Sequence, residues 1–153
     1  MTTKTTHAPQ QSGSMEGQPR LRQRSHEIQS VNQIRSLPIG LPEKAIGQSV
    51  TLLNQVLADT ITLYNLYKKH HWQVAGPTFY QLHRLLDKHA EKVLKSVDTV
   101  AERIQMLGGV ACGMPFEVAE HTKIERPPLG AEGVPALLAR TVDAHATVIR
   151  TIR

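Results

Sequence analysis

Cysteine, aromatic residues and long apolar runs are all scarce in this chain, and each shortage excludes a class of protein. Cys112 is the only cysteine, so no internal disulfide can form, and a lone thiol is typical of a reducing cytosol. No apolar run approaches the ~20 residues that span a bilayer, and the N-terminus lacks the hydrophobic core of a signal peptide. Aromatic residues make up only 4% of the chain, which suits an aliphatic helical core better than a β-sandwich. We therefore expect an all-α, cytoplasmic protein with no membrane partner.

Several motifs that define enzymes are also missing. The chain contains no His-Glu-x-x-His zinc motif, no phosphate-binding glycine loop and no Gly-x-Ser-x-Gly elbow. It also lacks Glu-x-x-His, the pair that builds di-iron sites inside a single four-helix bundle. These absences leave a metal site between subunits as the main enzymatic option.

Residues 1–40 read as a basic, disordered N-terminal tail, because they contain few apolar side chains to offset the entropy of ordering. The formal net charge of the chain is +5, which favours loose attraction to polyanions such as nucleic acid. A solubilising tail without a nucleic-acid partner is the alternative. The basic residues of the tail, which are the candidate DNA contacts, are Lys4, Arg20, Arg22, Arg24 and Arg35.

Residues 41–153 carry the pattern of a helical domain. Apolar residues at three- and four-residue steps predict a first helix from Pro42-Glu43 to Gly76-Pro77 and a second over residues 78–107. A short helix is expected over 116–121 in the following loop, and a third long helix begins near Val134. These helices make an up-and-down bundle that lacks a fourth long helix when the chain stops at Arg153.

The second helix carries two pairs of metal-ligand residues at helical spacing. His83 and Asp87 are four residues apart, as are Asp98 and Glu102, so each pair shares a face. The pairs face the same way but lie about 16 Å apart along the axis, at 1.5 Å per residue. One helix therefore cannot close a single site, whereas an antiparallel copy can. Packing around a two-fold axis places each pair opposite the other pair of the partner, which creates two identical sites.

His71, on the core-facing stripe at the end of the first helix, adds a further candidate ligand. Two imidazoles with three carboxylates suit Fe, Mn or Zn better than Ca or Mg. The alternative to a metal site is a purely structural role, with His71 as a core histidine and the acidic residues as a solvated face. The neighbouring His70 points about 100° away from His71 and is expected to face solvent. No ligand role is predicted for the remaining histidines, His7, His26, His89, His121 and His145.

The sequence resembles the Dps proteins, the bacterial and archaeal miniferritins also known as DNA-binding proteins from starved cells. The resemblance covers about residues 42–153. It rests on His71-Trp72-Gln73-Val74-Ala75-Gly76, with Phe79, His83 and Asp87, and on Asp98-Thr-Val-Ala-Glu102-Arg103 with Leu107-Gly108-Gly109. It implies a ferritin-like four-helix bundle with a short helix in its crossover loop, so the fourth helix is missing from this chain.

The resemblance also implies a function and a set of site residues. The family's ferroxidase ligands fall on His71, His83 and Asp87 of one subunit and on Asp98 and Glu102 of its two-fold partner. Trp72 matches an aromatic residue that intercepts oxidising equivalents. A dodecameric shell would oxidise Fe(II), with hydrogen peroxide as the preferred oxidant, and store ferric iron. Basic tails in this family bind DNA non-specifically, so the alternative is an architectural, nucleoid-associated DNA-binding protein whose metal site is secondary or inactive.

Overall fold

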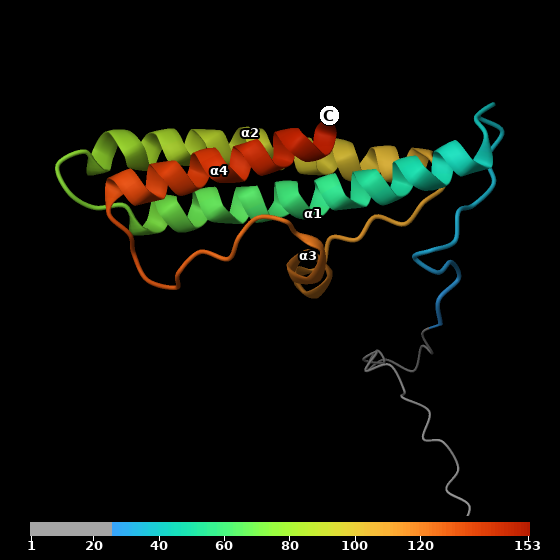
Figure 1. Ribbon diagram of the computed structural model, residues 1–153, viewed down its shortest axis with the longest axis horizontal. Coiled ribbons are helices and arrows are strands. Elements are labelled where there is room, and N and C mark those ends of the chain that lie inside the picture. Colours follow the sequence, from blue (N-terminus) through green and yellow to red (C-terminus); the bar gives the residue numbers. More distant parts are fainter. Residues whose placement is uncertain (1–25) are drawn as a thin grey trace, which may run out of the picture.

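The computed structural model describes residues 26–153. Its elements are α1 (Glu43–Gln73), α2 (Phe79–Met106), α3 (Pro115–His121) and α4 (Val134–Ile152), with no strand in this part of the chain. The three long helices lie side by side, with α2 and α4 antiparallel to α1, and α3 sits in the crossover between α2 and α4 (Figure 1). The predicted helices are therefore confirmed, although α1 ends at Gln73, a few residues before the expected Gly76-Pro77. None of the described helices is long and apolar enough to cross a bilayer.

Glycine determines how α2 ends. Gly108 has φ +79°, a left-handed conformation that only glycine adopts freely. Its N–H bonds the Gln105 carbonyl, and the N–H of Gly109 bonds the Ile104 carbonyl at 3.0 Å, which is the Schellman pattern. The Gly108 carbonyl in turn accepts hydrogen bonds from the Arg35 backbone N–H and the Gln29 side chain, both at 2.8 Å. The end of α2 thus anchors the segment that precedes α1.

The core consists of two clusters along α1. One joins the C-terminal half of α1 to the start of α2 and to α4, through residues such as Leu66, Leu86 and Leu137. The other joins the N-terminal half of α1 to the end of α2, around Leu57 and Ile104, which are 1% and 0% exposed. Because α1 contacts α2, α3 and α4, it is covered on several sides.

A buried carboxylate ties the crossover to α1 and α4. Asp59 is fully buried, and its oxygens accept hydrogen bonds from the Lys123 backbone N–H at 2.6 Å and the Thr122 hydroxyl at 3.0 Å. The Gln55 amide donates to it at 3.2 Å, and the Thr151 hydroxyl, which also reaches the Thr147 carbonyl at 3.2 Å, lies 3.4 Å from it. The side chain therefore connects three separate segments of the chain, which compensates for removing a charge from water.

Candidate metal centre

His71 and His83 face each other where α1 and α2 meet at their turn. Their rings stack with centroids 3.7 Å apart, and Phe79 lies 5.0 Å from His83. Nδ1 of His71 lies 2.8 Å from the His83 carbonyl oxygen, and Nδ1 of His83 lies 2.8 Å from the His71 carbonyl oxygen. A carbonyl oxygen only accepts, so Nδ1 carries the proton in both rings. In the neutral form of each ring Nε2 then holds the lone pair, which is the arrangement of a metal-binding histidine.

Asp87 lines the same open cavity as the two imidazoles, one helical turn after His83. Its carboxylate is held by the Lys68 ammonium at 2.6 Å. This hydrogen bond keeps the pKa of the Asp87 carboxyl below its usual value. Glu91, one further turn along α2, also lines the cavity and was not singled out by the sequence pattern. The cavity thus combines two imidazoles with two carboxylates, one of them already paired to a cation.

Lys68 competes with any cation for Asp87, so Lys68→Met is expected to raise the affinity for divalent metal a few-fold, since an exposed ion pair is worth at most about 1 kcal/mol. Anaerobic calorimetric titration with Co(II) measures the change. Lys69→Met is the matched control, because Lys69 bonds Gln73 and the Gly130 carbonyl instead of Asp87. Equal affinities in the two variants would contradict this role of Lys68.

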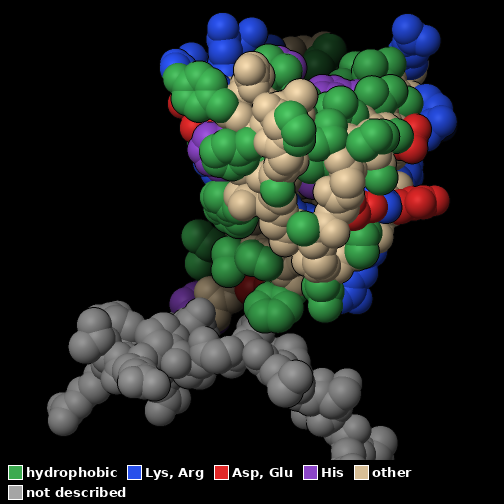
Figure 2. Space-filling model, turned by 90° about the vertical axis from the view of Figure 1, so that its left-hand side faces the viewer, with side chains coloured by type: hydrophobic (Ala, Val, Ile, Leu, Met, Phe, Trp, Pro, Cys, Tyr) green, Lys and Arg blue, Asp and Glu red, His purple; other side chains and the backbone are tan. Residues whose placement is uncertain are grey.

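The other predicted site residues lie apart from this cluster. Asp98 and Glu102 are exposed further along α2, and the described residues of a single chain contain no group of three or more ligand side chains close enough to hold a metal. Trp72 is 71% exposed, with Lys68 Nζ 5.9 Å from its ring centroid. The α1–α2 turn lies at the end of the bundle seen in Figure 2, where apolar side chains face outward and Lys and Arg side chains stand at the upper corners.

The five candidate DNA contacts fall on both sides of the start of the described residues. Lys4, Arg20, Arg22 and Arg24 lie outside the described residues. Arg35 lies inside them with an exposed side chain, and its backbone bonds Gly108.

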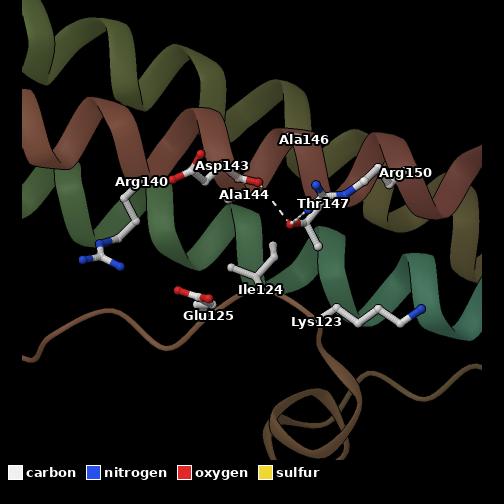
Figure 3. A pocket seen from close by; sticks show the side chains of 9 residues that line it. All are labelled: Lys123, Ile124, Glu125, Arg140, Asp143, Ala144, Ala146, Thr147 and Arg150. Carbon is white, nitrogen blue, oxygen red and sulfur yellow. Dashed lines mark hydrogen bonds between the residues drawn. The ribbon is translucent and has the colours of Figure 1, made fainter.

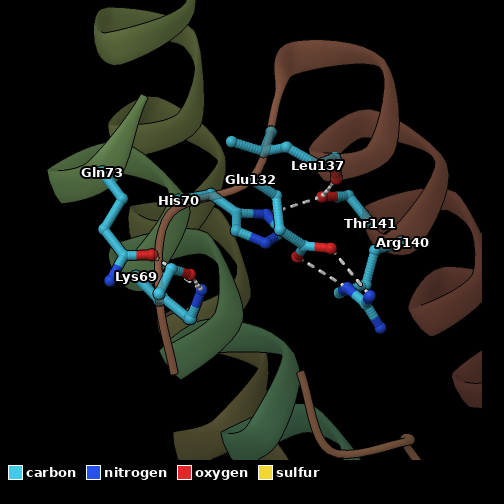
Figure 4. A network of polar contacts seen from close by, with 8 residues as sticks. Lys69, His70, Gln73, Glu132, Leu137, Arg140 and Thr141 are labelled. Atoms are coloured by element: carbon cyan, nitrogen blue, oxygen red, sulfur yellow. Dashed lines mark hydrogen bonds and ion pairs between the residues drawn. The ribbon is translucent and has the colours of Figure 1, made fainter. Parts of the chain in front are cut away.

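The prediction that His70 faces solvent was wrong. His70 is 1% exposed and sits between α1 and α4, beside the ion pair of Glu132 and Arg140 (Figure 4). Thr141 donates its hydroxyl proton to the Leu137 carbonyl, so it accepts the Nδ1–H of His70 at 3.0 Å. Nε2 of His70 remains without a hydrogen-bond partner within residues 26–153. His70 lies about 100° around the helix from His71. This direction leads to a second packed face, because α1 is covered on several sides.

This burial makes stability depend on pH. Burial, with Lys69 and Arg140 nearby and only Glu132 opposing them, lowers the pKa of His70 from 6.5 to about 4. Between these values the unfolded chain binds a proton that the folded chain refuses, so stability falls with falling pH. The free energy of unfolding should drop by up to about 3 kcal/mol across that window. Denaturant titrations of wild type and His70→Leu test this, since the variant should lose that share of the pH dependence. Parallel pH profiles in the two proteins would refute it.

A cavity between α4 and the crossover offers no comparable chemistry. Figure 3 shows Lys123 and Glu125 on the crossover facing Asp143, Thr147 and Arg150 on α4. The charges on its walls alternate in sign, so no single sign of ligand is favoured. The side chains suited to binding a metal, two imidazoles and two carboxylates, lie near the α1–α2 turn instead.

Comparisons with known proteins agree with this architecture. Residues 50–153 match the ferritin-like domain of the Ferritin family. An uncharacterised protein in the bpoA2 5′ region of Kitasatospora aureofaciens is 50% identical over 139 residues, covering 91% of this chain and 93% of that protein. The DNA protection during starvation protein of Agrobacterium fabrum is 33% identical over 113 residues, covering 74% and 70%.

A comparison with a solved structure supports the same fold. DpsC from Streptomyces coelicolor has a TM-score of 0.80 and 49% identity, covering 82% of this chain and 73% of that one. The family match spans more than half of the chain, and the Agrobacterium relative and the structural neighbour both carry Dps-type names. The chain therefore belongs to the ferritin-like proteins, and within them to the Dps-type miniferritins.

Proposed function

We propose that this protein is a ferroxidase that binds Fe(II) between two subunits, oxidises it with hydrogen peroxide and stores the ferric product in a dodecameric shell. The observation that carries this proposal is the pair of contacts between Nδ1 of each imidazole and the backbone carbonyl of the other histidine. Both rings donate Nδ1–H to a backbone carbonyl, so both present Nε2 as a ligand, in one cavity with Asp87.

The proposed site takes its remaining ligands from a second copy of the chain. Asp98 and Glu102 are exposed on the same side of α2 as His83 and Asp87. Leu94 lies between the two pairs on this side and is 47% exposed, although an apolar side chain in this position gains from burial. An antiparallel α2 partner covers Leu94 and brings the two halves of each site together, as an isologous interface requires.

The residues have distinct roles in this mechanism, in which Fe(II) is the substrate. The imidazoles favour iron over harder ions, and the carboxylates stabilise the higher charge of Fe(III). Two Fe(II) supply the electrons for one peroxide: H2O2 + 2Fe2+ + 2H+ → 2Fe3+ + 2H2O. Exposed Trp72, beside Lys68, is positioned to intercept oxidising equivalents that leave the site. Consuming Fe(II) and peroxide together protects nearby DNA from hydroxyl radicals.

The test follows Fe(II) oxidation by near-ultraviolet absorbance, with peroxide added to metal-free protein and buffer alone as the blank. We expect oxidation far faster than the blank, saturating at a fixed ratio of iron to subunit. A trace that matches the blank would reject ferroxidation by this chain.

The second candidate is non-specific DNA binding with a secondary or inactive metal site. It is favoured by the net charge of +5 and by the name of the Agrobacterium relative, a DNA protection protein. Deleting residues 2–25 removes Lys4, Arg20, Arg22 and Arg24 and keeps the bonds of Gln29 and Arg35 to Gly108. A DNA mobility shift that depends on these residues and disappears with salt would support it. A shift that survives the deletion would place the DNA contacts elsewhere.

A further inference from the structure

Tyr67 on α1 joins a histidine of α2 to a histidine of α4, beside a pocket that the three residues line together with Lys92 and Val93. The ring is 4% exposed, and its hydroxyl lies 2.6 Å from Nε2 of His145 on α4 and 3.3 Å from Nδ1 of His89 on α2. Both imidazoles also meet the phenol ring edge to face, at 5.6 and 5.5 Å between centroids. Neither histidine was expected to have such a partner, because the contact depends on three helices packing together.

The distances decide which way the hydrogen bonds run. A phenol has one proton to donate, and the shorter contact takes it, so Tyr67 donates to Nε2 of His145. The phenol oxygen then accepts Nδ1–H from His89 at the longer distance. His145 is therefore an unprotonated base in direct contact with a buried phenol, within the reach of a general base.

We propose that Tyr67 is a redox-active residue that donates one electron while its phenol proton moves to Nε2 of His145. A phenol that loses an electron becomes strongly acidic, so a base already at hydrogen-bond distance makes the oxidation easier. Burial raises the pKa of Tyr67, which keeps the phenol protonated beforehand. Burial and the charge of His89 lower the pKa of His145, which keeps its acceptor nitrogen free near neutral pH.

The location of Tyr67 allows its electron to take part in the reduction of peroxide, in a step that rests on the proposed ferroxidase function. Tyr67 precedes His71 by about one turn of α1, or 6 Å along the axis. When one Fe(II) is present, peroxide takes its second electron from the phenol: H2O2 + Fe2+ + TyrOH + His + 2H+ → 2H2O + Fe3+ + TyrO• + HisH+. The next Fe(II) restores the pair: TyrO• + HisH+ + Fe2+ → TyrOH + His + Fe3+. Peroxide is then reduced fully to water without releasing a hydroxyl radical.

The first arm of the test uses metal-free full-length protein and a photogenerated one-electron oxidant, with ring-deuterated tyrosine to identify tyrosyl radicals by electron paramagnetic resonance. We expect a long-lived tyrosyl signal that is lost in Tyr67→Phe. Tyr80→Phe should keep the signal, because Tyr80 is 62% exposed and bonds only Arg84 among the described residues. His145→Gln keeps a hydrogen-bond acceptor but removes the base, so it should lower the radical yield. A signal unchanged in Tyr67→Phe, or unaffected by His145→Gln, would overturn the proposal.

The second arm adds peroxide to protein holding less than one Fe(II) per site. A tyrosyl signal that depends on Tyr67, together with rapid Fe(II) oxidation, supports the donor role in iron chemistry. Rapid oxidation without that signal would overturn that role. A radical in the first arm with no iron oxidation in the second would leave the Tyr67–His145 pair standing and reject the ferroxidase function instead.

Discussion

The double variant His83→Ala with Asp87→Ala is expected to oxidise Fe(II) with peroxide no faster than buffer. It removes one imidazole and one carboxylate from the cavity shared with His71, while both positions are only partly buried. Fe(II) oxidation followed by absorbance measures the loss, and circular dichroism checks that the helices remain. The matched variant Asp98→Ala with Glu102→Ala should fail equally, because each site of the proposed dimer needs both halves.

Mixing the two inactive variants distinguishes an interfacial site from one within a subunit. A mixed dimer contains one complete site and one site that lacks both pairs. Random exchange of subunits should therefore restore roughly a quarter of the wild-type sites, as the two-fold symmetry dictates. Activity that stays absent after refolding the mixture, with mixed dimers demonstrated by mass spectrometry, would reject the shared site.

Replacing Asp59 by Ala is expected to lower the free energy of unfolding by about 3–5 kcal/mol, since hydrogen bonds to a charged group contribute about 1.5–3 kcal/mol each. The variant leaves the Lys123 N–H and the Thr122 hydroxyl without their acceptor, whereas the Gln55 amide keeps its bond to the His121 carbonyl. Denaturant unfolding followed by circular dichroism measures the change. Asp143→Ala is the control: it removes a carboxylate from the exposed face of α4 and should change stability by less than about 0.5 kcal/mol. Similar values for the two variants would show that the crossover is held by other contacts.

The helices were predictable from sequence because glycine and proline mark their ends. Gly108 is required by its positive φ, and Pro42 directly precedes the first helical residue. The pairing of His71 with His83 was also within reach, since both lie within two turns of one hairpin turn. Local signals of this kind do not depend on how distant segments pack.

The rest depended on packing that one sequence does not reveal. His70 was misplaced because a single apolar stripe describes a helix with one covered side, and α1 has several. Asp59 reads as an isolated acid in an apolar run, and the crossover residues that bond it lie more than sixty positions later. Tyr67 joins His89 to His145, which are remote in sequence. The second half of the proposed iron site lies on another molecule and stays a prediction.

The reciprocal hydrogen bonds between His71 and His83 pre-organise the two imidazoles that we propose as ligands. Each ring is oriented by the backbone of the other, so the rotational entropy of both imidazoles is lost when the protein folds and not when an ion arrives. The same geometry would couple metal occupancy to local opening, because separating the start of α2 from the end of α1 would release both proposed ligands together. A bound ion should therefore slow hydrogen exchange at this end of the hairpin more than elsewhere in the bundle.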